Sequence, residues 1–371
     1  MNKKYIGPKF AKDVVNTTQG KLFPAESDSV SLTTWNETKN RLDKGSQSGS
    51  TFSSDVVSTY SLLYTNEFGA YTGGVLDSKG FIHFVPTRAT IGQKISPKGI
   101  VSTYALVTTA PGEYVGGVLA PNGDIHFVPY GAQIGQKVSI NNIVSTYSLP
   151  YTTSEAYCGG MLLPNGEIHF IPNAARAGTK IMPNGTITTY PLPYTNMYGA
   201  YYGGVLSPNG NTYFVSQSFV GSKLSSTGTV STYSTPSIMF RGGVLASNGD
   251  IHFVPYNADV NTKMTMNETF STYPLAYTTE NAYDGGVLAP NGDIHFAPYL
   301  ATVGQKVTKN GIAKTYSLAL TQSWAYKGAV LGMDNYIYFV PFTASVGQRV
   351  KVYSGSSWDL AFRMHPHFNK F

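Results

Sequence analysis

Charged residues and cysteine are scarce in this sequence. Asp, Glu, Lys and Arg make up 12% of its 371 residues, and Cys158 is the single cysteine, so no disulfide can form within the chain. No run of about 18 apolar residues indicates a transmembrane helix, and no signal peptide is recognisable. No window has the 3.6-residue apolar spacing of an amphipathic helix. These absences exclude a disulfide-stapled scaffold and disfavour a helical membrane protein or a helical repeat.

A recurring motif organises the chain instead. One copy reads GGVLAPNGDIHFVPY, over residues 116–130, and successive copies begin 39 to 44 residues apart. The seven copies begin at Gly73, Gly116, Gly159, Gly203, Gly242, Gly285 and Gly328. Repeats of this length occur both in helical arrays and in propeller blades, so the content of the repeated unit must decide between them.

Each repeated unit contains four short segments with the composition of β-strands. In the second copy they are 117–119, 125–129, 136–138 and 143–149, all rich in Val, Ile, Phe, Tyr and Thr and bounded by Gly, Pro or Asn. Four antiparallel strands in about 43 residues are typical of one propeller blade. The sequence therefore predicts an all-β fold, a seven-bladed β-propeller of four-stranded antiparallel blades.

The ends of the repeat region indicate how the ring closes. Residues 57–62 have the sequence of a fourth strand but precede the first Gly-Gly pair. We expect this segment to form the outer strand of the last blade, which would join the two ends of the propeller and protect its sheet edges. Residues 354–360 are an alternative occupant of the same place.

The chain is expected to have three parts. Residues 1–54 would be a docking arm and linker, residues 55–353 the propeller, and residues 354–371 a short tail. The sequence Thr-Trp-Asn-Glu at 34–37 resembles a helix start and predicts a short helix at about residues 34–44. The arm carries Tyr5, Phe10 and Trp35 as candidate docking residues.

Histidine occupies one motif position in five of the copies. These residues are His83, His126, His169, His252 and His295, whereas Tyr213 and Tyr338 stand at this position in the other two copies. Equivalent residues of successive blades are spread around a ring and cannot converge on one metal ion. We expect a half-buried, hydrogen-bonding structural role, and no metal site. Cys158 is expected to be a neutral filler, because Thr72, Val115 or Asp284 stand in its place in other copies.

A second repeated position is cationic in every copy and is taken as the opening residue of the third strand. We expect it on the same face as the tyrosine-rich loops that join the blades, forming a candidate ligand- or partner-binding face. The candidate residues are Lys94, Lys137, Lys180, Lys223, Lys263, Lys306 and Arg349, with Tyr71, Tyr157, Tyr201, Tyr283 and Tyr326. The alternative is a solubilising charge that the repeat merely copies.

The acidic residues of the hairpin turns are expected on the opposite face. They are Asp124, Glu167, Asp250 and Asp293. The disc would then be basic on one side and acidic on the other, which suits anion or glycan binding, or head-to-tail assembly.

Known catalytic motifs are missing from the sequence. It contains no Gly-x-Ser-x-Gly, no His-Glu-x-x-His and no phosphate-binding Gly-x-x-x-x-Gly-Lys-Ser/Thr. We therefore expect no catalytic residue and no cofactor, and interpret the protein as non-enzymatic.

The repeat GGVL-x-Pro-Asn-Gly-x-Ile-His-Phe-Val-Pro resembles propeller repeats of virus and bacteriophage structural proteins, over about 300 residues. This resemblance implies a virion component, here of a phage, whose propeller is a display or docking disc. Its partners would be other virion structural proteins and a host-surface glycan or receptor, with no membrane span and no nucleic acid. The alternatives are a free lectin-like glycan-binding propeller and, with less support, a polysaccharide lyase or hydrolase.

Overall fold

The computed structural model describes residues 55–352, apart from 194, 196–198, 237 and 238, together with three short strands nearer the N-terminus. The chain divides into two compact units, residues 1–54 and residues 55–371. No helix in these described parts is long and apolar enough to cross a membrane.

The first unit contains a three-stranded antiparallel sheet in the order β1-β2-β3. The strands are β1 (Lys21–Leu22), β2 (Thr33–Asn36) and β3 (Arg41–Lys44). The prediction of a helix at residues 34–44 is therefore wrong for β2 and β3. The β-branched and aromatic residues Thr33, Thr34 and Trp35 favour a strand more than the helix-start pattern favours a helix. Trp35 lies in β2, whereas Tyr5 and Phe10 lie outside the described residues.

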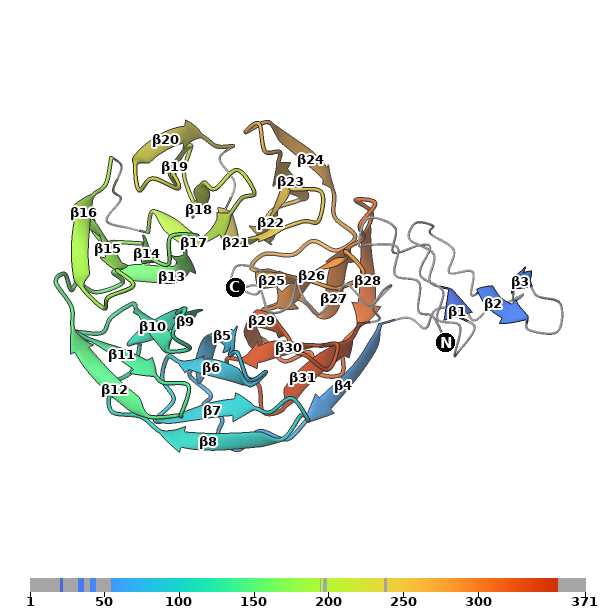
Figure 1. Cartoon of the computed structure of the whole chain (residues 1–371), viewed down its shortest axis with the longest axis horizontal. Coiled ribbons are helices and arrows are strands. Elements are labelled where there is room, and N and C mark those ends of the chain that lie inside the picture. Colours follow the sequence, from blue (N-terminus) through green and yellow to red (C-terminus); the bar gives the residue numbers. More distant parts are fainter. Residues whose placement is uncertain are drawn as a thin grey trace. The chain divides into compact units, whose positions relative to one another are not determined.

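The second unit confirms the predicted seven-bladed propeller, with its blades arranged in sequence order around a central axis (Figure 1). Each blade is a four-stranded antiparallel sheet, and we number the blades 1 to 7 along the chain. The strands of blades 1 to 3, from the axis outward, are β5 (Tyr71–Leu76), β6 (Ile82–Pro86), β7 (Ile91–Ile95) and β8 (Val101–Ala105); β9 (Tyr114–Leu119), β10 (Ile125–Pro129), β11 (Ile134–Val138) and β12 (Val144–Ser148); and β13 (Tyr157–Leu162), β14 (Ile168–Pro172), β15 (Ala177–Ile181) and β16 (Ile187–Pro191).

The remaining blades follow the same plan. Their strands are β17 (Tyr201–Leu206), β18 (Thr212–Ser216), β19 (Val220–Leu224) and β20 (Val230–Ser234); β21 (Met239–Leu245), β22 (Ile251–Asn257), β23 (Val260–Met264) and β24 (Phe270–Pro274); β25 (Tyr283–Leu288), β26 (Ile294–Pro298), β27 (Val303–Val307) and β28 (Ala313–Ser317); and β29 (Tyr326–Leu331), β30 (Tyr336–Pro341), β31 (Gly347–Lys351) and β4 (Val56–Tyr60).

The ring closes through β4, as the sequence predicts. This strand precedes blade 1 in the chain but pairs with β31 of blade 7, with Gly347 opposite Tyr60 and Lys351 opposite Val56. The first strand of the propeller thus completes its last blade and leaves no open sheet edge between the two. The competing segment, residues 354–360, lies outside the described residues.

The core lies between neighbouring blades. At the boundary of blades 1 and 2, Val75 and Val85 of one blade pack with Tyr114 and Phe127 of the next. The double glycine permits this packing close to the axis. Gly73 has a φ of +77°, and a Cβ added to it would lie 2.9 Å from the Cα of Gly116. The Gly-Gly pairs therefore let the innermost strands approach one another.

The outer half of most blades is held by a Tyr-on-Gly contact. In blade 2, the Tyr147 ring of β12 covers Gly135 of β11, where an added Cβ would lie 2.1 Å from a ring carbon. The His of β10 completes the unit, because His126 Nδ1 lies 3.2 Å from the Tyr147 hydroxyl. The other tyrosines of this position also meet histidine in blades 1, 5 and 6. The repeated histidines are thus structural groups, and they are buried rather than half-buried as the sequence analysis expected.

Candidate functional site

The two faces of the disc differ in the connections that they carry. The loops that join successive blades lie on one, which we call the joining-loop face. The turns between the first and second strands and between the third and fourth strands lie on the other, the hairpin-turn face. Each innermost strand begins at the joining-loop face, so the first residues of these strands surround the axis at this end.

The tyrosine that begins most innermost strands belongs to the core. Tyr71, Tyr157, Tyr201, Tyr283 and Tyr326 are all fully buried. The Tyr71 hydroxyl donates to Ile91 O at 2.9 Å, and the Tyr326 hydroxyl to Val346 O at 2.9 Å, which anchors the innermost strand to the third strand of the same blade. The prediction that these five tyrosines form a binding face is therefore wrong.

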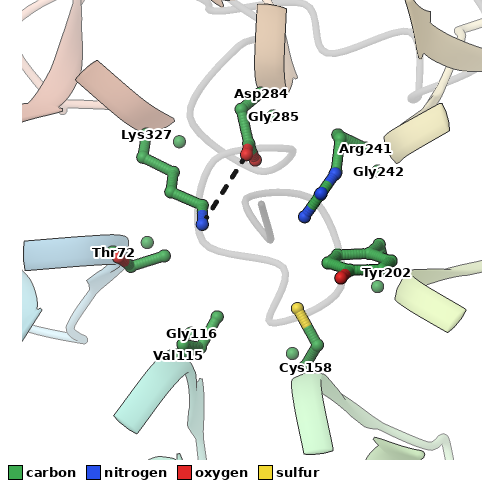
Figure 2. A pocket seen from close by; sticks show the side chains of 14 residues that line it. Thr72, Val115, Gly116, Cys158, Tyr202, Arg241, Gly242, Asp284, Gly285 and Lys327 are labelled. Atoms are coloured by element: carbon green, nitrogen blue, oxygen red, sulfur yellow. Dashed lines mark ion pairs between the residues drawn. The ribbon is translucent and has the colours of Figure 1, made fainter. Parts of the chain in front are cut away.

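The residue between this tyrosine and the Gly-Gly pair faces the axis instead (Figure 2). The residues at this position are Thr72, Val115, Cys158, Tyr202, Arg241, Asp284 and Lys327, one from each blade. Together with the neighbouring glycines they line a space of about 40 Å³ that opens into solvent. We call this set the axial ring and the space the axial channel.

The charges of the axial ring lie on one side of it. Blades 5, 6 and 7 supply Arg241, Asp284 and Lys327, whereas blades 1 to 3 supply the uncharged Thr72, Val115 and Cys158. Lys327 Nζ lies 3.8 Å from Asp284 Oδ2. Two cations and one carboxylate give this side a net positive charge, which favours an anionic ligand.

Arg241 is held between two aromatic rings. Its guanidinium carbon lies 3.7 Å from the centre of the Tyr202 ring and 4.4 Å from that of Tyr256. Stacking of this kind fixes the plane of the guanidinium and leaves its edge to donate hydrogen bonds. Burial is the largest single influence on the pKa of Arg241 and lowers it, but Asp284, Tyr202, Tyr256 and Cys158 together outweigh burial, so this pKa is raised above its usual value.

An arc of aromatic rings continues from Arg241 along the same side. The Tyr256 and Tyr299 ring centres are 6.1 Å apart, as are those of Tyr299 and Phe342, and Lys327 Nζ lies 5.5 Å from the centre of the Phe342 ring. All three rings are half-buried. Burial raises the pKa of Tyr299 to about 12, so its hydroxyl is a neutral hydrogen-bond donor at physiological pH. These rings offer an apolar surface beside the charged groups.

Cys158 also belongs to the axial ring, with Arg241, Asp284 and Lys327. Burial raises the pKa of its thiol to about 11, although Lys327 and Arg241 oppose this shift. The thiol is therefore protonated at neutral pH and is not an activated nucleophile. This agrees with the neutral role expected from the sequence.

The repeated cations lie far from this ring, on the hairpin-turn face. Lys137 is the next-to-last residue of β11, not its first, so it lies beside the turn between β9 and β10. There its Nζ contacts Asp124 Oδ2 at 2.7 Å. The third strand begins two residues earlier than the sequence analysis placed it, because Ile134 and Gly135 were assigned to the preceding bend.

The other cations of this position also have polar partners. Lys180 pairs with Glu167, Lys263 with Asp250, Lys306 with Asp293 and Asp55, Lys223 with Glu268, and Arg349 with Asp334, while Lys94 donates to Asn142. Cations and acids thus share one face and neutralise each other. The prediction of a disc with one basic and one acidic side is wrong.

Sequence reasoning missed Arg241, Asp284, Lys327 and Tyr202. The signal that could have found them is variation: the position before Gly-Gly differs in every blade of a chain whose other positions repeat. The repeated histidines and lysines were chosen as candidates because they recur in the motif, but this recurrence reflects a structural role.

Neither a protein-family model nor a curated protein matches the sequence. Solved structures do share the fold. A catalytically inactive variant of virginiamycin B lyase from Staphylococcus aureus, with quinupristin, has a TM-score of 0.70 and 18% identity, over 81% of this chain and 100% of the lyase chain. A streptogramin B lyase has a TM-score of 0.70 and 19% identity, over 81% of this chain and 98% of that one. YCF48 bound to D1 peptide has a TM-score of 0.59 and 12% identity, over 82% and 96%.

These likenesses show the fold alone, because the identities are low. They nevertheless overturn the expectation of a non-enzymatic protein, since the propeller that this chain forms is also the scaffold of lyases. They give no support to the resemblance to virion propellers. What the chain shares with these proteins is a seven-bladed all-β propeller with four-stranded blades.

Proposed function

We propose that the axial channel binds a small molecule with an anionic group, and that Asp284 and Lys327 provide proton-transfer chemistry on it. One observation carries this proposal: the axial ring is the repeat position at which every blade differs, and its charged members adjoin one another. A ring that was packed like the interior of the blades would be expected to repeat like the rest of the blade.

Anion recognition would fall to Arg241 and Lys327. Arg241 presents a fixed, stacked guanidinium, which matches the planar geometry of a carboxylate. Tyr256, Tyr299 and Phe342 offer apolar contact to the body of the ligand, so an aromatic or alicyclic carboxylate fits best.

Proton transfer would fall to the Asp284–Lys327 pair. A carboxylate can accept a proton from the ligand, and the ammonium group of Lys327 can stabilise the negative charge that develops. In an elimination, Asp284 would take a proton from a ligand carbon, a double bond would form to the neighbouring carbon, and the bond from that carbon to the leaving group would break, with Lys327 donating a proton to the departing group. The lyases that share the fold add support by analogy only.

Calorimetric titration with benzoate and benzamide tests the binding part of the proposal. Wild-type protein should bind benzoate and not the matched neutral amide, and Arg241→Met should weaken benzoate binding by about tenfold or more. Asp284→Asn should strengthen it, because the substitution removes a competing carboxylate from Lys327. Equal binding of acid and amide, or an unchanged affinity in Arg241→Met, would contradict the proposal.

A panel of aryl-substituted carboxylates that carry a leaving group on the β-carbon, followed by mass spectrometry, tests the chemical part. Asp284→Asn should abolish conversion while it retains benzoate binding. Conversion that survives in this variant would remove Asp284 from the proposed role.

We further propose, from the repeat resemblance, that the propeller is a component of a virion and docks there on other structural proteins. Large exposed apolar side chains on the joining-loop face support docking: Leu63, Phe68, Phe219 and Trp324 are 62%, 68%, 68% and 52% exposed. Co-expression with neighbouring gene products, followed by native mass measurement with and without residues 1–54, tests this. A full-length chain that stays monomeric would contradict assembly and direct attention to the glycan-binding alternative.

A further inference from the structure

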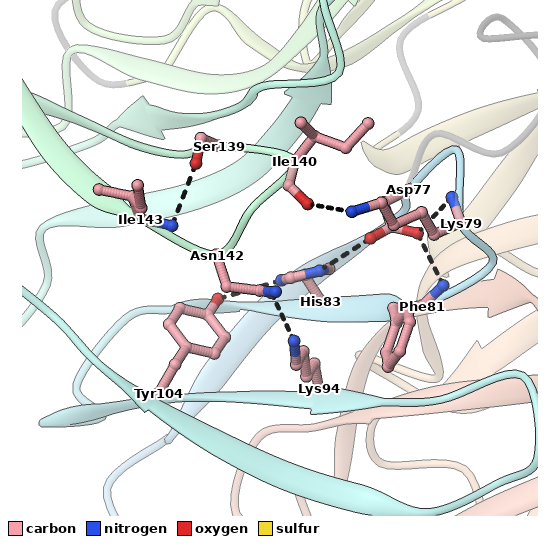
Figure 3. A network of polar contacts seen from close by, with 10 residues as sticks. All are labelled: Asp77, Lys79, Phe81, His83, Lys94, Tyr104, Ser139, Ile140, Asn142 and Ile143. Carbon is pink, nitrogen blue, oxygen red and sulfur yellow. Dashed lines mark hydrogen bonds and ion pairs between the residues drawn. The ribbon is translucent and has the colours of Figure 1, made fainter.

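On the hairpin-turn face, the cation at the end of a third strand can meet the edge of the following blade, mostly at the turn between its third and fourth strands. We call the place between the two a slot. Between blades 1 and 2, Lys94 donates to Asn142 Oδ1 across this slot (Figure 3). Between blades 4 and 5, Glu268 Oε1 accepts hydrogen bonds from Lys223 and from the Tyr213 hydroxyl, the latter at 2.9 Å.

The slot between blades 6 and 7 is filled in the same way. Lys306 Nζ lies 3.0 Å from Asp293 Oδ2 of its own blade and 2.7 Å from Asp55 Oδ2, next to the outer strand of blade 7. A lysine–carboxylate pair of this repeat therefore accepts a second carboxylate. Burial opposes the charge of Lys306, but both carboxylates favour it, and its pKa is raised above the usual value.

The turn residue that reaches into a slot has an unfavourable backbone conformation. Asn142 and Glu268 have φ angles of 62° and 61°, at a turn position where Gly185, Gly228 and Gly311 stand in other blades. A left-handed conformation costs a residue with a side chain some free energy that glycine avoids. Asn142 and Glu268 keep this conformation, and their side-chain oxygens meet the lysine of the preceding blade.

The slot between blades 5 and 6 lacks such a side chain. Its turn residue is Gly311, and a Cβ added there would have no heavy atom within 4 Å. Lys263 Nζ lies 2.7 Å from Asp250 Oδ2, as Lys306 does near Asp293, but the Lys263 side chain is 33% exposed whereas that of Lys306 is 15% exposed. A pocket of about 300 Å³ that opens to solvent is lined by residues that include His252, Lys263, Tyr273 and Gly311.

We infer that this slot binds a carboxylate supplied by another molecule, which occupies the place that Asp55 takes between blades 6 and 7. Lys263 donates to the incoming carboxylate while it keeps its contact with Asp250. The carboxylate comes from a free small acid or from a polypeptide, and the chemistry that recognises it is the same. This site is on the face opposite the axial channel and does not depend on the function proposed there.

Nuclear magnetic resonance of the full-length chain tests this inference, with acetate as the probe and chloride at equal ionic strength as the reference. Acetate should shift the Lys263 ε-methylene and His252 ring signals until saturation. Gly311→Glu, which supplies a carboxylate from within as Glu268 does, should lower the shift about tenfold. Gly185→Glu places the same change in the slot between blades 2 and 3, and it should leave the Lys263 response intact.

The reciprocal variant removes the carboxylate side chain that fills the slot between blades 4 and 5. Glu268→Gly should create a new saturable acetate response at Lys223, which has no acid in the first hairpin turn of its own blade. A tripeptide with a free C-terminal carboxylate, compared with its amide, separates the two sources. Tighter binding of the peptide acid than of acetate indicates a polypeptide, and equal binding indicates a free acid.

Two results would overturn the inference. One is the absence of a saturable acetate shift at Lys263 in the wild-type protein. The other is an undiminished His252 shift in Lys263→Gln, a variant that keeps the turn unchanged and remains informative even where Gly311→Glu does not fold.

Discussion

The interior of the blades and the axial ring differ in how far the same residue type is repeated from blade to blade. In the interior, one position of the second strand is phenylalanine in all seven blades: Phe84, Phe127, Phe170, Phe214, Phe253, Phe296 and Phe339. In the axial ring, the seven equivalent residues all differ. Each of these side chains packs against the preceding blade, so the same geometry demands the same residue at every boundary. Axial residues face open space, where side chains can diverge without loss of packing.

Acid should affect the repeated interior most strongly. Burial lowers the pKa of His126 and His252 to about 4 and that of His295 to about 3, below the value of about 6.5 in an unfolded chain. Between these values the unfolded state binds more protons, so stability is present above pH of about 6.5 and is lost as the pH falls towards 4, by up to roughly 3 kcal/mol per histidine.

Urea denaturation between pH 7 and pH 4 measures this loss. His295→Tyr introduces the residue that blades 4 and 7 carry at this position. It should make the fall of the free energy of unfolding with decreasing pH less steep. An identical slope in wild type and variant would show that His295 is not buried in its neutral form.

Replacing one interior glycine by valine should have the next largest effect on the free energy of unfolding. Gly135→Val places atoms inside the Tyr147 ring, which lies 2.1 Å from an added Cβ. The ring must move, and the expected loss is about 3 kcal/mol in the free energy of unfolding. Chemical denaturation measures it, with Gly135→Val/Tyr147→Ala as the control in which the clash is relieved. If Gly135→Val alone left stability unchanged, the Tyr-on-Gly contact would not hold the blade.

Axial substitutions should have the smallest effect on stability. Val115→Thr and Thr72→Val exchange residues that neighbouring blades already carry and should change the free energy of unfolding by less than about 1 kcal/mol. Thermal denaturation checks this. A loss as large as that of Gly135→Val would mean that the axial ring is packed like the interior.

The rate at which the Cys158 thiol is alkylated is a further test of the comparison between the axial ring and the blade interior. Because burial raises its pKa to about 11, alkylation by iodoacetamide at pH 7.5 should be far slower than that of an exposed cysteine. Mass spectrometry over time measures the rate. Rapid labelling would indicate an activated thiol and would reopen Cys158 as a chemical participant.

The fold was predictable from sequence because repetition reports packing. The number of blades and the closure by residues 56–60 follow from counting copies of a motif that must bury the same faces seven times. The face on which the lysines lie was not predictable in this way, because the third strand was started two residues too late and its next-to-last residue, the lysine, was taken as its first. The axial ring was not predicted from the sequence because its residues share no pattern. Only the three-dimensional structure brings Arg241 and Lys327 to one channel.

The location of a bound aromatic carboxylate tests the central claim most directly. Crystals soaked in 4-bromobenzoate would show the bromine by its anomalous scattering. The account predicts one bromine at the joining-loop end of the axial channel, with the carboxylate within hydrogen-bonding distance of Arg241 or Lys327. An empty channel at a concentration that saturates binding in solution, or a bromine elsewhere on the propeller alone, would contradict the assignment of the axial ring as the functional site.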